Sequence, residues 1–106
     1  MSFNTTFELT NGVAKIAISG DLDASSASIF KEEVEKAAVP DLKRLVLLVS
    51  GLEYMASAGL RVLIFAKQKM GSGVDIYFVG AQEAVLDTIQ KTGFNHSVII
   101  QDEYTE

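Results

Sequence analysis

The run LVLLV at residues 45–49 is apolar at every position. A strand with one face in water alternates apolar and polar residues, so a run without alternation predicts a strand buried on both faces. Burial on both faces requires a place inside a sheet, with helices packed over it. This run therefore favours an α/β fold with an internal strand at its centre.

The segments around this run supply the other elements of such a fold. Asn11-Gly12 lies between two strand-like runs and predicts a β-hairpin, because both residues tolerate the positive φ of a type I′ turn. Apolar residues spaced three or four apart predict amphipathic helices. After a first strand around Phe7, the elements are expected at residues 13–19 (strand), 24–39 (helix), 45–49 (strand), 57–70 (helix), 74–80 (strand), 81–92 (helix) and 97–101 (strand).

Single residues predict where the first helix begins and ends. Gly20 is expected to end the second strand, and residues 21–23 are expected to form a short loop. Asp23 or Ser25 is the predicted cap of the helix that follows. Pro40 lies just beyond the end of that helix, where it cannot continue the helical hydrogen bonds.

The predicted order is β-β-α-β-α-β-α-β. Helices that alternate with strands imply right-handed crossovers and a mostly parallel mixed sheet, to which the opening hairpin adds an antiparallel edge. Gly93 suits the left-handed position after the last helix, with Phe94 folding back onto it, and the acidic tail 102–106 is expected to fray. No linker or repeat interrupts the order, so we expect a single domain over residues 1–106.

Composition excludes several classes of function. The chain has no cysteine and one histidine, His96, which excludes disulfides, thiolate chemistry and Cys-rich or His-rich metal sites. Its formal net charge of −5 would repel a phosphate backbone, so nucleic acid is not an expected partner. The chain starts without the features of a signal peptide, and its apolar runs are shorter than the roughly 18 residues of a membrane span. We expect a cytoplasmic protein without direct membrane insertion.

Ser57 is the candidate for a chemical role, because it stands among small residues at the predicted start of a helix. Met-Ala-Ser-Ala-Gly at 55–59 resembles the nucleophile elbow of hydrolases, but Met55 occupies a position that should be small. No general base accompanies the serine, so we expect no enzyme, no catalytic residue, no metal and no cofactor. A simple helix cap is the common role of such a serine. Gly59 in the first turn costs about 1 kcal/mol relative to alanine, which indicates either close packing or a need for access.

Two further sets of residues are candidate sites. Asp21 and Asp23 are spaced like two ligands of a divalent ion, although a role in the loop and in helix capping explains them more simply. Arg61 follows Ser57 by four residues, so the two side chains share one face of the predicted helix. Phe65 lies one turn further along and is predicted to be an exposed anchor for a partner. Alternatively, Arg61 only keeps this outer face soluble.

Three segments resemble the STAS domain family, and more narrowly the single-domain anti-sigma factor antagonists of bacteria. They are GDLDASSA (20–27), LVLLVSGLEYMASAGLRVLI (45–64) and KTGF (91–94). The resemblance implies that the phosphorylatable serine of the family is Ser57 and that its loop aspartate is Asp23. The chain departs from the family on both sides of this serine. The family often has Asp before it and a second Ser after it, whereas this chain has Ala56 and Ala58.

The resemblance implies a partner-switching protein in signal transduction and transcription regulation. With Ser57 unmodified, it would bind an anti-sigma factor that is also a serine kinase, and a metal-dependent serine phosphatase would reverse the phosphorylation. The residues expected at the partner interface are Asp21, Asp23, Ala56, Ala58, Gly59, Arg61 and Phe65. Two alternatives stay open: a docking subunit of a membrane transport or lipid-transport complex, and a nucleotide-binding STAS module.

Overall fold

The structure is a computed structural model, and it describes residues 3–104. Over this range the strands and helices follow the predicted order, with one additional 3₁₀ helix near the C-terminus. The elements are β1 (Phe3–Thr10), β2 (Val13–Leu22), α1 (Ala27–Ala37), β3 (Arg44–Met55), α2 (Ser57–Met70), β4 (Asp75–Val79), α3 (Glu83–Thr92), η1 (Phe94–His96) and β5 (Ile99–Gln101).

The strands form one mixed sheet in the order β1-β2-β3-β4-β5. β1 pairs with β2 antiparallel, and the other three pairings are parallel. The hairpin turn has φ of 50° at Asn11 and 79° at Gly12, which confirms the type I′ conformation. The predicted fold class is therefore confirmed, including the antiparallel edge.

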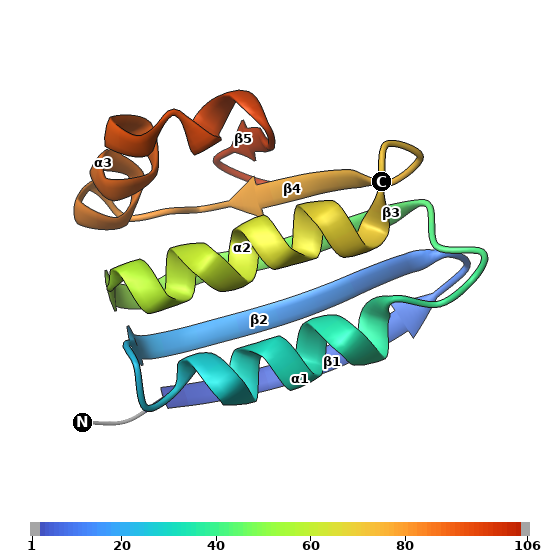
Figure 1. The fold of residues 1–106 in the computed structure, drawn as a ribbon, viewed down its shortest axis with the longest axis horizontal. Coiled ribbons are helices and arrows are strands. Elements are labelled where there is room, and N and C mark those ends of the chain that lie inside the picture. The colour runs from blue at the N-terminus through green and yellow to red at the C-terminus, as the bar shows by residue number, and fades with distance from the viewer. Residues whose placement is uncertain (1–2, 105–106) are drawn as a thin grey trace.

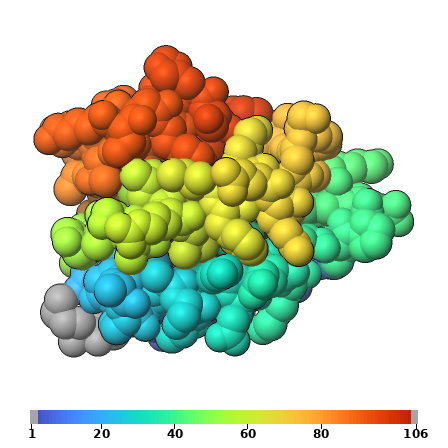
Figure 2. Space-filling model, viewed as in Figure 1, coloured from blue at the N-terminus to red at the C-terminus, as the bar shows by residue number. Residues whose placement is uncertain are grey.

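One hydrophobic core lies between the sheet and its helices. α1 and α2 lie side by side across one face of the sheet, and α3 lies beyond the end of β4 (Figure 1). Strand residues such as Ile16, Leu47 and Phe78 meet Phe30 of α1 and Leu63 of α2 there. In the space-filling view, α2 forms a continuous exposed strip between α1 and α3 (Figure 2).

The central strand is internal, as its composition predicts. Four of the five residues in the run at 45–49 are buried, and Leu48 is half-buried. β3 is the only strand in the described chain whose two neighbours, β2 and β4, both run parallel and both pair over five or more residues. The apolar run therefore lies in the middle of the parallel part of the sheet.

β2 and β3 are both longer than predicted, and this difference shapes the site described below. Gly20 does not end β2, because Gly20 pairs with Leu52 and the strand continues to Leu22. β3 likewise continues past Gly51 to Met55. Two register shifts interrupt the pairing of these strands, and a φ of 91° at Gly20 accommodates the second of them. The residues predicted as a loop, 21–23, thus begin inside a strand.

The other corrections concern the ends of elements. α1 begins at Ala27, three residues later than predicted, because residues 24–26 form a turn held by Asp23. α2 spans Ser57–Met70 as predicted, and Gly93 has the predicted left-handed conformation with Phe94 buried beyond it. The tail does not fray up to Tyr104, whose ring lies 5.3 Å from that of Tyr77. Residues 105–106 lie outside the described residues.

Candidate functional site

The carboxyl ends of β2 and β3 meet at the start of α2. Leu22 pairs with Met55 at the last position of both strands, and Asp21 pairs with Tyr54. The next residue, Ala56, donates its N–H to the Leu22 carbonyl at 2.8 Å. Only Ala56 separates β3 from α2. This geometry brings the loop aspartates close to Ser57.

Ser57 is the first residue of α2, and its side chain is exposed. The cap position belongs to Ala56, which is extended with φ of −84° and ψ of 172° and has no side chain able to cap. The interpretation of Ser57 as a helix cap is therefore wrong. The N–H groups of Ser57 and Ala58 have no carbonyl partner within the helix, because they belong to its first turn. An exposed hydroxyl thus stands at the positive end of a fourteen-residue helix.

Gly59 allows α2 to approach the end of β2. It is buried, and a Cβ on it would lie 2.6 Å from the Cγ and Cδ2 atoms of Leu22 and 3.0 Å from the Cγ of Met55. The sequence left two reasons open for this glycine, close packing and access, and the structure selects close packing. Ala56 and Ala58 on either side of Ser57 are half-buried, so the hydroxyl stands out from its neighbours.

Asp23 holds the turn that leads from β2 into α1. Its Oδ1 accepts the Ser25 hydroxyl at 2.7 Å, the Ser25 N–H at 3.0 Å and the Ser26 N–H at 3.2 Å. These hydrogen bonds, the one from the Ser25 hydroxyl above all, hold the pKa of the Asp23 carboxyl below its usual range. The predicted role of Asp23 in the loop is confirmed. The prediction that Asp23 or Ser25 is the cap of the helix is wrong, because α1 begins at Ala27 and its cap position is Ser26.

Ser26 is a residue of this site that the sequence did not single out. It is 4% exposed and stands at the cap position of α1. Its hydroxyl donates to the Asp21 carbonyl at 2.8 Å and accepts the Asp23 N–H at 2.9 Å. The half-buried Asp21 therefore contributes its main chain to this turn. An Asp followed by a Ser three residues later, after a strand, is the signal that would have revealed this turn, because both side chains bond to nearby main-chain groups.

The outer face of α2 carries both charged and apolar side chains. Arg61 is exposed, as predicted, and forms no ion pair or hydrogen bond with another described residue. Phe65 is half-buried instead of exposed, because it packs against the core and the Nζ of Lys31 lies 4.7 Å from its ring centre. The exposed apolar side chain on this face is Ile64, at 40% exposure and seven residues after Ser57, which places it above Ser57 on the helix.

Tyr54 is a second exposed apolar side chain, near the end of β3. Because Met55 packs under Gly59 of α2, strand alternation turns the neighbouring Tyr54 toward the other face of the sheet. Its side chain is 53% exposed, the largest value among the exposed large hydrophobic residues of the described chain. Tyr54 and Ile64 were not predicted as site residues, because an apolar residue in a strand or helix is usually part of the core. Ser57, Arg61 and Ile64 share the outer face of α2, whereas Tyr54 is a separate exposed side chain near the start of that helix.

Residues 3–104 contain no group of three or more His, Cys, Asp or Glu side chains that could hold a metal ion. No helix in this range is long and apolar enough to cross a membrane.

Comparisons with known proteins agree on one family. The family model described as the STAS domain matches residues 4–106. The anti-sigma-F factor antagonist RsfB of Mycobacterium tuberculosis, from two strains, is 30% identical over 73 residues, which are 69% of this chain and 60% of RsfB. The match thus spans 60% of the length of these curated relatives.

Solved structures share the fold. An anti-sigma factor antagonist from Mycobacterium paratuberculosis superposes with a TM-score of 0.87 at 24% identity, covering 96% of this chain and 87% of that protein. The unphosphorylated form of the anti-sigma factor antagonist SpoIIAA gives a TM-score of 0.80 at 16% identity, covering 97% and 90%. The phosphorylated form of SpoIIAA from Bacillus gives 0.73 at 15% identity, covering 97% and 93%. At these identities the likeness establishes the fold alone.

Proposed function

Because the chain belongs to the STAS domain family, we propose that it is a single STAS domain that acts as an anti-sigma factor antagonist. It acts by binding a partner and does not catalyse a reaction. The relative RsfB bears this function in its name, and the resemblance at residues 45–64 includes the strand and helix start that carry Ser57. The observation that carries the proposal is the exposed hydroxyl of Ser57 at the start of α2.

In this proposal the partner is an anti-sigma factor that is also a serine kinase. The Ser57 Oγ attacks the γ-phosphorus of ATP, the bond to the ADP oxygen breaks, and the hydroxyl proton is lost to the kinase or to solvent. A metal-dependent serine phosphatase hydrolyses the ester and restores the hydroxyl. A sigma factor works where transcription takes place, so the proposal implies a cytoplasmic protein.

The position of Ser57 explains why a phosphate there would switch binding without unfolding the domain. A phosphoserine carries about −1.5 to −2 charges at pH 7, and the N-terminus of a helix tolerates such an anion. The side chain is exposed, so the phosphate needs no rearrangement of the core. It would instead stand at the start of the α2 face that carries Arg61 and Ile64, where it would repel or displace an apolar partner.

The residues expected at this interface divide into two groups. Ser57, Ala58 and Arg61 would contact the partner, together with the exposed side chains of Tyr54 and Ile64. The second group would act mainly by holding the backbone and the helix that present this surface. Its members are Asp21, Asp23, Ala56, Gly59 and Phe65.

The test has two parts. Mass spectrometry of the protein from its native cell should find phosphate on Ser57, and wild-type protein used as bait should retain an anti-sigma factor that Ser57→Asp loses. Ser72→Asp is the matched control, since Ser72 is an exposed serine in the turn after α2 and receives the same charge. Retention of the same partner by Ser57→Asp, or its loss from Ser72→Asp as well, would contradict the proposal.

A further inference from the structure

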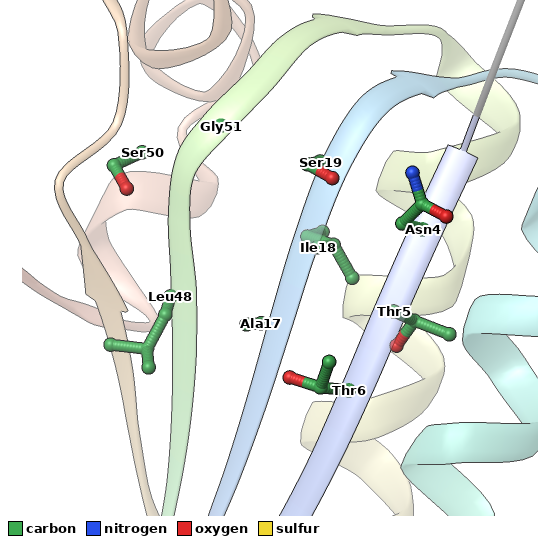
Figure 3. Close-up of a pocket in the computed structure, with 9 residues that line it drawn as sticks. All are labelled: Asn4, Thr5, Thr6, Ala17, Ile18, Ser19, Leu48, Ser50 and Gly51. Atoms are coloured by element: carbon green, nitrogen blue, oxygen red, sulfur yellow. The ribbon is translucent and has the colours of Figure 1, made fainter.

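A hollow of about 370 Å³ lies on the sheet, away from Ser57. Its lining comes from three neighbouring strands, β1, β2 and β3, and the helices lie behind the sheet in this view (Figure 3). Small-molecule sites in proteins occupy about 300 to 1,000 Å³, so the hollow is large enough for a small ligand. It is separate from the partner surface proposed above.

A register shift between β2 and β3 creates the hollow. Ala17 pairs with Leu48, but the next pair is Ser19 with Gly51, so β3 places two residues opposite one residue of β2. Gly51 has no side chain, and a Cβ on it would lie 2.8 Å from the Cβ of Ser19. The short side chains of Ala17, Ser19 and Gly51 therefore leave space above the sheet that larger residues would fill.

The chemistry of the lining is uniform. Nine residues line the hollow and none of them is charged, although 22% of the chain is Asp, Glu, Lys or Arg. The lining offers the hydroxyl groups of Thr6, Ser19 and Ser50 and the side-chain amide of Asn4, each of which can donate and accept hydrogen bonds. Ala17 and Leu48 add an apolar floor. Such a set suits a neutral molecule and offers no counter-charge to an ion.

Strand alternation decides which of these side chains face the hollow. Asn4 and Thr6 pair with Ser19 and Ala17, so these four side chains share the face of the sheet that carries the hollow. Thr5 pairs with the buried Ile18, and their side chains point to the opposite face, toward the helices.

From these observations we propose that the hollow binds a small uncharged molecule with several hydroxyl groups, of the size of a monosaccharide or cyclic polyol. The lining determines this class, because it combines hydroxyl and amide groups with an apolar floor and carries no charge. The inference does not depend on Ser57 or on the proposed anti-sigma function.

The experiment is a titration of isotope-labelled protein with glucose and with myo-inositol, followed by amide chemical shifts. Glucose 6-phosphate is the charged counterpart. We expect saturable shifts, confined to the lining residues, with at least one neutral probe at a Kd of about 10 mM or below, and binding at least about tenfold weaker with the phosphate ester.

Two variants and one control make the result specific. Ala17→Leu fills the floor and Thr6→Val removes one lining hydroxyl, so each should weaken binding by about tenfold or more. Thr10→Val is the control, because Thr10 is an exposed threonine of the same strand that does not line the hollow. Absence of saturable shifts with both neutral probes, equal binding of the phosphate ester, or equal effects of Thr6→Val and Thr10→Val would overturn the proposal.

Discussion

At the scale of single residues, Gly59 shows how a small side chain at the site is set by packing. Alanine is normally favoured over glycine inside a helix by about 1 kcal/mol. Here the added Cβ would lie 2.6 Å from two atoms of Leu22, which is fully buried, so the core around Leu22 would have to shift. Overpacking of this kind costs about 1 to 3 kcal/mol. We therefore expect Gly59→Ala to lower the free energy of unfolding by about 1 to 2 kcal/mol in urea denaturation.

Gly73→Ala is the matched control for this prediction. Nothing lies within 4 Å of a Cβ at Gly73, and Gly73 does not have a positive φ. The same substitution there should leave stability unchanged or raise it by about 0.4 to 1 kcal/mol, because alanine restricts the unfolded chain. If both variants were as stable as wild type, the close contact between α2 and Leu22 would not limit residue 59.

At the scale of elements, the turn before α1 predicts a pH dependence. The folded-state pKa of Asp23 is held below its ordinary value, chiefly by the Ser25 hydroxyl, so the ionised carboxylate stabilises the folded state. For a lowered pKa, this stabilisation is complete above the unfolded-state pKa and is lost as pH falls through the folded-state pKa. The difference in unfolding free energy between wild type and Asp23→Asn should therefore be largest near neutral pH.

The measurement is urea unfolding of both proteins at several values between about pH 7 and pH 3. The advantage of wild type should shrink toward the acidic end of this range. Asp41→Asn is the control, since Asp41 is exposed and no side-chain hydrogen bond to it is found among the described residues. A wild-type advantage that stays constant with pH would show that the Asp23 charge does not stabilise the turn.

The elements also show what sequence patterns can predict here. The uniformly apolar run at 45–49 predicted that β3 is an internal strand. The spacing of apolar residues over 57–70 predicted the bounds of α2. The ends of β2 and β3 were missed, because Gly20 and Gly51 are typical of strand ends when read locally. Pairing between the two strands overrides that preference at the register shifts. The position of Ser57 was predictable, whereas the packing of Gly59 on Leu22 needed the tertiary structure.

At the scale of the whole molecule, the C-terminal tail closes over the sheet. Tyr104 accepts a hydrogen bond from Arg44 Nη1 at 3.0 Å, although the two residues are 60 positions apart in the chain. Its ring also meets the edge of Tyr77 and lies 5.5 Å from Lys15 Nζ. These contacts join the tail to three strands that are far away in the sequence, so the residues near the tail carry no pattern that predicts them. From the sequence alone, a polar C-terminal tail is therefore expected to fray.

Tyr104 therefore predicts a stepwise loss of stability. Tyr104→Phe removes only the hydroxyl that accepts the Arg44 N–H, so it should lower the free energy of unfolding by about 0.5 to 1.5 kcal/mol. Tyr104→Ala also removes the ring that contacts Tyr77 and Lys15 and should cost about 1 to 3 kcal/mol. Tyr54→Ala is the control, because Tyr54 is 53% exposed and its loss should change stability by no more than about 0.5 kcal/mol.

The same variants separate stability from binding. Arg44 begins β3 and Ser57 follows its end, so the full twelve-residue strand lies between the tail contact and the partner surface. Tyr104→Ala should therefore keep the affinity for the partner at temperatures where it stays folded, whereas Tyr54→Ala should weaken that affinity while stability is kept. Substitutions more than about 10 Å apart with no shared contacts are usually additive. A Tyr104→Ala protein that is folded but has lost its partner would show that the two ends of β3 are coupled, and that the tail belongs to the switch.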